Sequence, residues 1–404
     1  MYKSLKSDFP ILQKKIRNNN ITYLDTASTS QKPNSVIESI TNFYQNSYEN
    51  VHRGMNSLSI DATEIFEASR EKIKNFINAK SSNEIIFTKN ATEGTNIIAH
   101  AMSSLLNDGD EIITTELEHH SNFLPWLSLC KNKNLKFKVI PLLPNGTIKE
   151  EDVINAISSS TKLVAISHMS NVTGQMIDVK KIKTSTVNKD ILFFIDGCQS
   201  IAHRKVDVQE LDCDFFVFSS HKLYGPSGVG VLYGKEELLN KLPPVSFGGG
   251  MINQVELDSF TTALLPNKFE SGTPPIEAVA GLSSALDYLI KNKFENYFDE
   301  EVTLRQNLID ELKNLGNIDI YGVSDDIIAS SIVSFNVQGK NYNDIATFLD
   351  QYGVMIRSGS HCCQPFMKKL KIPGTCRVSF GIYNSKEDIS IFIDALNKTN
   401  KLLS

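Results

Sequence analysis

Seven short apolar runs lie between residues 84 and 235, and stretches with the apolar spacing of amphipathic helices separate most of them. The runs are Glu84–Thr88, Glu111–Thr115, Lys136–Ile140, Lys162–Ser167, Ile191–Asp196, Asp214–Ser219 and Val229–Tyr233. Several are apolar on both faces, as are strands of a parallel sheet covered by helices. The last two runs are joined by a loop too short for a crossover helix, so the final strand is expected to be antiparallel. The pattern predicts an α/β domain around a mainly parallel seven-stranded sheet.

The remaining apolar periodicity predicts a second, smaller domain. Helices are expected at 36–44, 62–78 and 275–292, then at 299–314, 342–351 and 386–398, with strands at 331–335, 354–357 and 376–380. We therefore expect a segment 1–20 that packs on the small domain, a large domain 21–290 and a small α+β domain 291–404.

Composition narrows the class of protein. The chain has 404 residues, 41% of them hydrophobic and 22% charged, which is enough for two well-packed domains. Its net charge of -5 comes from interspersed charges of both signs, so neither a nucleic-acid partner nor an anionic membrane is expected. No apolar run approaches the length of a membrane span, and no secretory signal is visible at the N-terminus. We expect a cytoplasmic protein.

The six cysteines, at 130, 198, 213, 362, 363 and 376, are too sparse for a disulfide framework and favour a reducing compartment. A zinc site built from His361 and the three C-terminal cysteines is disfavoured, because adjacent cysteines make poor tetrahedral geometry. No metal is expected. Cys130, Cys198 and Cys213 are interpreted as small core residues.

Chemically competent side chains follow several of the predicted strands. Asp196 ends one strand and Lys222 follows the next, while Asn171 and His119 follow two others. Ligands of open α/β sheets bind at the carboxyl ends of the strands. Pyridoxal phosphate needs a lysine for covalent attachment and a carboxylate at the ring nitrogen, and its phosphate suits a helix N-terminus such as the one at 90–95. Singly, each residue could be a helix cap or a loop residue; together, they favour a pyridoxal-phosphate site.

The segment Ser219–Gly230, SSHKLYGPSGVG, resembles the cofactor-lysine motif of class V aminotransferase-fold enzymes, and most of all that of Suf-type (group II) cysteine desulfurases and their selenocysteine lyase relatives. Supporting motifs run in order along nearly the whole chain: Tyr23–Ala27, Val51–Gly54, Glu118–Asn122, Phe269–Pro274, Arg357–Cys362 and Gly374–Ser379. The resemblance implies the fold type I architecture of pyridoxal-phosphate-dependent transferases and a homodimer.

The resemblance also implies a role for each matching residue. Lys222 would carry pyridoxal 5'-phosphate, with Asp196 at the ring nitrogen, Gln199 at the ring hydroxyl, Asn171 beside the ring and His119 stacked on it. The phosphate would be held by Thr92, Ser219, His221 and, from a second subunit, Thr273. Arg377 would bind the substrate carboxylate, with Arg357, His52 and Asn171 near the substrate. Cys362 would accept the sulfur, making Cys362, Lys222 and His119 the catalytic set.

A cysteine at 362 suits this chemistry, because a thiolate attacks sulfur well at neutral pH. Arg357, His361 and the lysines at 368, 369 and 371 are expected to make the surroundings cationic, and Gly359 and Pro365 predict a tight loop. A thiol on such a loop cannot travel far, so a separate acceptor protein is expected to collect the persulfide for iron–sulfur cluster assembly. Where relatives that use a zinc-containing scaffold carry histidine, this chain has Asn343, which favours a SufE-like acceptor.

Other functions remain compatible with these residues. Selenocysteine lysis, cysteine-sulfinate desulfination and amino transfer use the same fold, and a non-catalytic scaffold would keep the fold without the chemistry. Cys363 could resolve the persulfide as a disulfide or be a spectator. Ser360 and Ala91 depart from the common pattern of the family, at positions that often hold histidine and a hydroxyl residue.

Overall fold

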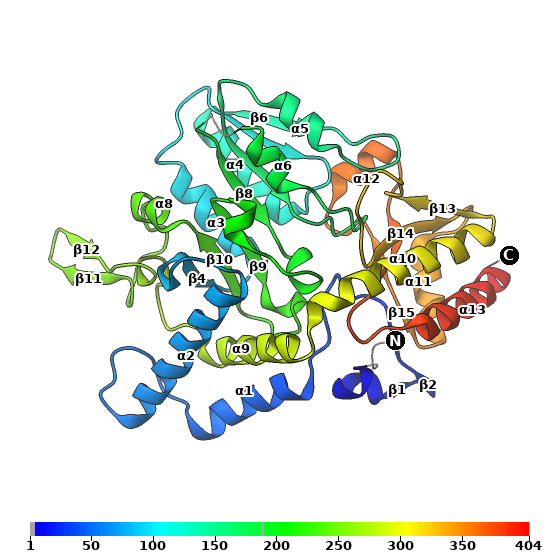
Figure 1. Ribbon diagram of the computed structural model, residues 1–404, viewed down its shortest axis with the longest axis horizontal. Helices are drawn as coiled ribbons and strands as arrows, with labels where there is room; N and C mark the ends of the chain where they lie inside the picture. Colours follow the sequence, from blue (N-terminus) through cyan, green and yellow to red (C-terminus); the bar gives the residue numbers. More distant parts are fainter. Residues whose placement is uncertain (1–4, 187–189, 404) are drawn as a thin grey trace.

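The computed structural model describes residues 5–186 and 190–403. Its centre is a seven-stranded sheet with the strand order β4-β10-β9-β8-β7-β5-β6. Several strands of this sheet are labelled in the middle of Figure 1. The strands are β4 (Ile85–Thr88), β5 (Glu111–Thr115), β6 (Lys136–Ile140), β7 (Thr161–Ser167), β8 (Leu192–Asp196), β9 (Phe215–Ser219) and β10 (Gly230–Gly234). β10 runs antiparallel to both of its neighbours and the other pairs are parallel. The mainly parallel sheet and its antiparallel last strand are confirmed.

Alternate side chains of each strand enter two separate hydrophobic cores. In β10, Val231 and Tyr233 belong to one core and Leu232 to the other, because successive side chains of a strand point to opposite faces. One face is covered by α3 (Ala91–Met102), α4 (Leu124–Lys133) and α8 (Glu236–Lys241). The opposite face is covered by α2 (Ser57–Phe76), α5 (Glu150–Ala156), α6 (Val179–Thr184), α7 (Val208–Leu211) and α9 (Ile276–Lys291). Outside them, α1 (Asn34–Asn46) packs on α9.

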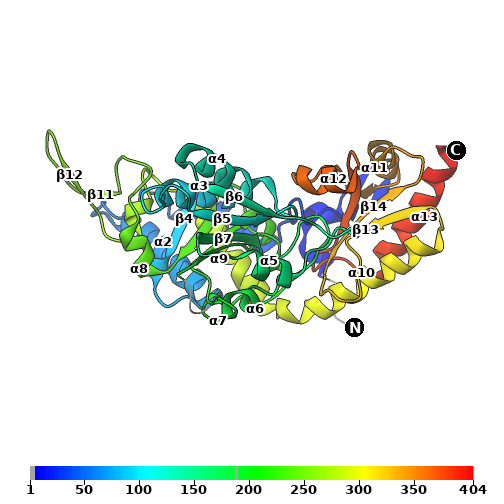
Figure 2. The same cartoon turned by 90° about the horizontal axis from the view of Figure 1, so that it is seen from above.

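The C-terminal part contains a four-stranded antiparallel sheet with the order β13-β14-β17-β16, seen beside the large sheet in Figure 2. Its strands are β13 (Ile318–Tyr321), β14 (Ile332–Val337), β16 (Arg357–Gly359) and β17 (Thr375–Ser379). Its helices are α10 (Tyr297–Asn314), α11 (Tyr342–Gln351), α12 (Gln364–Leu370) and α13 (Lys386–Leu402). A third core, between this sheet and α10, α11 and α13, completes an α+β arrangement.

The N-terminal segment packs where the two parts meet. The Phe9 ring contacts Tyr224 and Tyr288 of the large part and Tyr383 of the C-terminal part. After the short pair β1 (Lys15–Ile16) and β2 (Asn19–Asn20), β3 (Thr22–Tyr23) runs parallel to β15 (Val354–Met355). The chain thus joins the C-terminal part before it enters the large sheet.

Several elements were not predicted from the apolar pattern, and the most prominent of them lie in the C-terminal part and next to the large sheet. These prominent elements are β13, the helix α12, and the hairpin of β11 (Ile252–Val255) and β12 (Phe260–Thr262), which projects from the large part in Figures 1 and 2. None of the helices within residues 5–186 and 190–403 combines the length and the apolar character that a membrane span requires. In the same residues, no three His, Cys, Asp or Glu side chains are grouped so that they could hold a metal ion.

Candidate active site

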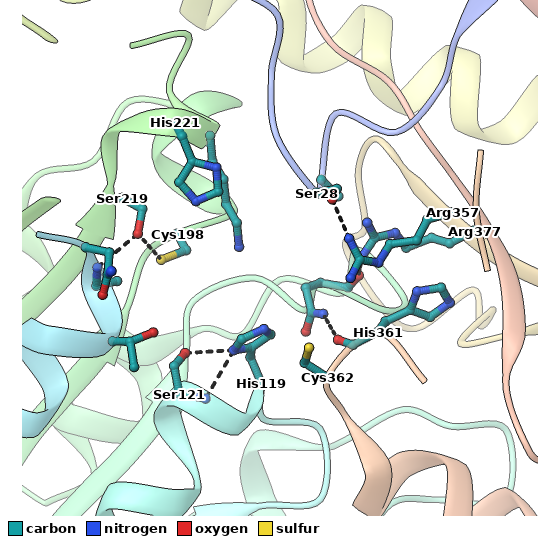
Figure 3. A pocket seen from close by; sticks show the side chains of 16 residues that line it. Ser28, His119, Ser121, Cys198, Ser219, His221, Arg357, His361, Cys362 and Arg377 are labelled. Carbon is teal, nitrogen blue, oxygen red and sulfur yellow. Dashed lines mark hydrogen bonds between the residues drawn. The ribbon is translucent and has the colours of Figure 1, made fainter. Parts of the chain in front are cut away.

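The polar residues that end the strands of the large sheet meet the C-terminal part in one cavity of about 260 Å³. Figure 3 shows side chains of both parts on its walls. The cavity is lined by Ala27, Ser28, Asn90, Ala91, Thr92, His119, Ser121, Asn171, Cys198, Ser219, His221, Lys222, Arg357, His361, Cys362 and Arg377. Nine of the thirteen predicted site residues are among them; Asp196, Gln199, His52 and Thr273 are not.

Lys222 lies in the single turn Ser220–Lys222 that directly follows β9. The main-chain carbonyl of the preceding residue, His221, accepts hydrogen bonds from Ser30 N–H and Lys32 Nζ, so this turn is held from the N-terminal side of the chain. No residue within 5–186 and 190–403 forms a hydrogen bond or ion pair with Lys222 Nζ. The amine is therefore available to a group in the cavity.

Asp196 and Gln199 flank Cys198 at the end of β8, and both are buried. Asp196 Oδ1 accepts the Cys198 N–H at 2.9 Å, while Oδ2 has no hydrogen-bond partner in the described part of the chain. Gln199 donates from Nε2 to the Ala27 carbonyl at 2.8 Å. One oxygen of the Asp196 carboxylate can thus accept a hydrogen bond from a protonated ring nitrogen.

The N-terminus of α3 opens on the cavity beside β9. Asn90 caps the helix by accepting the Glu93 N–H, and Ala91 N–H donates to Ser219 Oγ at 2.9 Å. Thr92 is exposed in the first turn and has no side-chain hydrogen bond to a described residue. N–H groups and hydroxyls at a helix N-terminus form a common phosphate-binding arrangement.

His119 is neutral at ordinary pH and holds its proton on one defined nitrogen. Burial, and next the charge of Lys222, lower its pKa to about 3. Nδ1 accepts the Ser121 main-chain N–H at 3.1 Å, so the proton of the neutral ring is on Nε2.

Arg377 is buried at the centre of β17, where Arg357 of β16 is its direct partner in the antiparallel ladder. Its two terminal nitrogens donate to the Asn171 carbonyl at 2.9 Å and to Asp25 Oδ1 at 3.0 Å, but Nε has no hydrogen-bond partner among the described residues. Leaving a buried donor unpaired costs about 1–3 kcal/mol. Arg377 lines the cavity, so its guanidinium can bind a carboxylate on this wall.

Taken together, these groups fit pyridoxal phosphate and an amino acid. Lys222 has an available amine, Asp196 has an unused carboxylate oxygen, and the start of α3 with Ser219 can hold a phosphate. The Arg377 guanidinium lies on the side of the cavity formed by the C-terminal part.

Cys362 lies in a tight turn between β16 and α12, which agrees with the prediction from Gly359 and Pro365, and its thiol is half-buried on the cavity wall (Figure 3). Both His361 and Cys362 have left-handed backbone angles, φ 52° and 55°, which cost about 1–2 kcal/mol each outside glycine. Asn171 holds this turn from the large part, because its Nδ2 donates to the His361 carbonyl at 2.8 Å.

The expected cationic surroundings of Cys362 need one correction. His361 was expected to contribute positive charge, but it is buried and its pKa is lowered to about 2, first by burial and then by Arg377 and Arg357. Its imidazole is therefore neutral. On the side of the cavity formed by the C-terminal part, the positive charge comes from Arg357 and Arg377, both of which line it.

Two other cysteines lie close to the site. Burial raises the pKa of the Cys363 thiol, whose Sγ lies 3.6 Å from the Glu116 carbonyl and does not line the cavity. Cys198, interpreted from the sequence as a core residue, is buried but does line the cavity. Its position after Asp196 at a strand end was the signal that could have placed it there. Burial also raises the pKa of Cys198, which keeps it a protonated thiol.

His52 and Thr273 lie together in a different hollow. Both are exposed and line a depression with Gly250, Ile252 and Glu270. His52 Nε2 lies 3.7 Å from Glu67 Oε1, and Arg70 joins Glu67 to Glu270 through a buried guanidinium. Within one chain, these two residues do not reach the cavity of Lys222.

Known proteins resemble the chain over nearly its full length. The family model described as aminotransferase class-V matches residues 22–392. A probable cysteine desulfurase from Halalkalibacterium halodurans is 44% identical over 98% of this chain and 97% of its own. A cysteine desulfurase from Serratia proteamaculans is 41% identical over 99% and 98%.

Solved structures agree with this assignment. A cysteine desulfurase from Escherichia coli superposes with a TM-score of 0.90 at 35% identity, covering 98% of each chain. The apo cysteine desulfurase from Thermococcus onnurineus gives 0.92 at 36% identity, covering 99% of this chain and 100% of its own. The chain belongs to the aminotransferase class-V family and, within it, groups with the pyridoxal-phosphate-dependent cysteine desulfurases.

Proposed function

We propose that this chain is a cysteine desulfurase that transfers the sulfur of L-cysteine to Cys362. The observation that carries the proposal is the meeting of the Cys362 thiol with Lys222 and Arg377 in one cavity, formed by two parts of the chain. In the reaction, the substrate C–S bond breaks and an S–S bond forms on Cys362. The electron pair of the broken bond stays with the substrate carbon, which takes up a proton and leaves as alanine.

The residues of the large part prepare the substrate. Pyridoxal phosphate supplies an electron sink at the α-carbon when it is bound. Asp196 would keep the proton on the ring nitrogen, Gln199 would bond the ring hydroxyl, and Asn171 would contact the ring. Thr92, Ser219 and His221 would bind the phosphate. Lys222 carries the cofactor and then removes the α-proton with its Nζ.

The residues that face the substrate orient it for sulfur transfer. Arg377 binds the carboxylate as a planar fork, and Arg357 adds positive charge beside it. His119 presents the flat face of a neutral ring and holds a proton on Nε2. Cys362 then attacks the substrate sulfur.

This function is tested by measuring the amounts of alanine and sulfide that the enzyme forms. Purified holoenzyme given L-cysteine and a thiol reductant is expected to form alanine and sulfide in equal amounts, with no keto acid required. Alanine formation that depends on an added keto acid would instead identify an aminotransferase. Repeating the assay with a SufE-like protein and with a zinc-containing scaffold tests the choice of acceptor.

We further propose a Suf-type enzyme that delivers sulfur to a SufE-like acceptor for iron–sulfur cluster assembly. Asn343 lies at the start of α11, where Ser358 of β16 donates to its Oδ1 at 2.8 Å, close to the strand that leads to Cys362. An amide is a poor zinc ligand beside imidazole and thiolate. Asn343 is therefore poorly suited to bind the zinc ion of a scaffold protein, which leaves a SufE-like protein as the proposed acceptor.

We also propose that the active enzyme is a homodimer in which His52 and Thr273 act in the cavity of the partner subunit. Several large apolar side chains are exposed on α1 and α2, in the segment between these helices, and in or beside the projecting hairpin. They are Tyr44, Tyr48, Met55, Leu58, Phe247, Val255, Leu257, Phe260 and Leu264. An exposed apolar surface of this kind is typical of a protein–protein interface.

Charging the hairpin is expected to separate the subunits. The double variant Leu257→Glu/Phe260→Glu should raise the dimer dissociation constant at least about 100-fold, since two charged side chains would be buried in an apolar interface. Sedimentation velocity measures this change, and desulfurase activity should fall as dimer is lost. Leu402→Glu, at an exposed position on α13, is the matched control. A wild-type protein that is monomeric and fully active would contradict the proposal.

A further inference from the structure

The turn that carries Cys362 forms two hydrogen bonds with one residue of the large part, His120. The main-chain N–H of His120 donates to the Cys362 carbonyl at 2.8 Å. Its imidazole Nε2 lies 3.1 Å from the main-chain nitrogen of Gln364, whose N–H it accepts. His120 itself does not line the cavity, in contrast to its neighbour His119.

The turn has few means of holding this conformation by itself. Gln364 is the first residue of α12, and the side chain of the N-cap residue Cys363 forms no capping hydrogen bond within the described part of the chain. The first N–H groups of a helix need acceptors from outside it, and His120 supplies one. His361 and Cys362 meanwhile keep left-handed backbone angles that side-chain-bearing residues rarely adopt.

We propose that His120 is a positioning residue that fixes the Cys362 thiol at the distance from Lys222 that sulfur transfer requires. This role rests on the proposed desulfurase function and adds to it a residue that touches neither substrate nor cofactor. The imidazole acts as a hydrogen-bond acceptor, so it must be neutral. Burial lowers the pKa of His120, which favours that form at neutral pH.

The acceptor atom can be removed or kept by substitution. His120→Leu deletes the Nε2 acceptor but keeps the main-chain N–H, whereas His120→Gln can place Oε1 near the same point. We expect His120→Leu to lower kcat for L-cysteine roughly 10- to 100-fold, since small misplacement of a reacting group has effects of that size. KM and cofactor absorbance should stay close to wild type, and His120→Gln should restore most of kcat.

Alkylation of the resting holoenzyme provides a readout that does not depend on turnover. Iodoacetamide labelling of Cys362, followed by mass spectrometry of its peptide, should be faster in His120→Leu because the released turn exposes the thiol. Faster labelling together with slower turnover distinguishes mispositioning from general damage, which would also lower the cofactor content. Gln364→Ala is the matched control, because it keeps the main-chain N–H and should behave as wild type in both measurements.

The proposal is overturned if His120→Leu keeps the wild-type kcat, or if His120→Gln is as impaired as His120→Leu while Cys362 labelling is unchanged. The underlying function fails separately, if the wild-type holoenzyme itself places no sulfur on Cys362. The labelling comparison would still report whether His120 positions the turn.

Discussion

Replacing Cys362 with serine is expected to lower turnover of L-cysteine at least about 1,000-fold. A serine hydroxyl is protonated at neutral pH and is a poor nucleophile toward sulfur, whereas a cysteine thiolate attacks sulfur readily. Lys222 and Arg377 still line the cavity in this variant, so the cofactor content and the affinity for cysteine should stay close to those of the wild type. Alanine production under single-turnover and steady-state conditions measures the loss.

Cys363→Ser is the matched control for this substitution. The Cys363 thiol does not line the cavity and lies 3.6 Å from the Glu116 carbonyl, and a serine hydroxyl can donate to the same oxygen. It should keep most of the activity. Full activity of Cys362→Ser would remove Cys362 from the reaction. Selenocysteine as a substrate distinguishes a selenocysteine lyase from a cysteine desulfurase. Selenium leaves readily, so the lysis of selenocysteine should continue in the variant that lacks the Cys362 thiol.

Replacing Arg377 with lysine is expected to reduce kcat/KM for L-cysteine roughly 100-fold or more. Lysine keeps the positive charge but cannot form the planar fork that a carboxylate accepts, and each lost charge-assisted hydrogen bond is worth about 1.5–3 kcal/mol. Asp25 would also lose its partner at 3.0 Å. Initial rates across a range of cysteine concentrations measure the effect.

Arg305→Lys controls for shortening a buried arginine outside the cavity. Arg305 is also buried and donates to the carbonyls of Ile332 and Gly322. This variant should lose thermal stability without a change in KM. If Arg377→Lys has a wild-type KM and kcat, the substrate carboxylate binds elsewhere.

Much of this architecture could be predicted from the sequence, because the strands of the large sheet place side chains in two hydrophobic cores and are therefore apolar at consecutive positions. A strand such as Phe215–Ser219, apolar on both faces, has few alternatives to a central position between helices. The strand ends then converge at one edge, which is why the sequence alone predicts that Lys222, Asn171 and His119 lie near one another. The hairpin β11–β12 has exposed side chains along most of its length, so it carries no alternation between buried and exposed positions.

The parts of the site that depend on contacts between distant segments could not be predicted. Whether His120 contacts the turn at Cys362 depends on how the C-terminal sheet docks on the large one. The charge of His361 was misjudged for the same reason, since its burial is set by packing against β17 and its bond to Thr375 Oγ1 at 2.8 Å. His52 and Thr273 were assigned by resemblance alone, and in a single chain they lie away from the cavity.

The most direct test is mass spectrometry of the holoenzyme after brief exposure to L-cysteine, with fragmentation of the peptide that contains Cys362 and Cys363. We expect one added sulfur atom on Cys362, and none in the Cys362→Ser variant. Sulfur found on Cys363, or alanine formed while the peptide stays unmodified, would contradict this expectation.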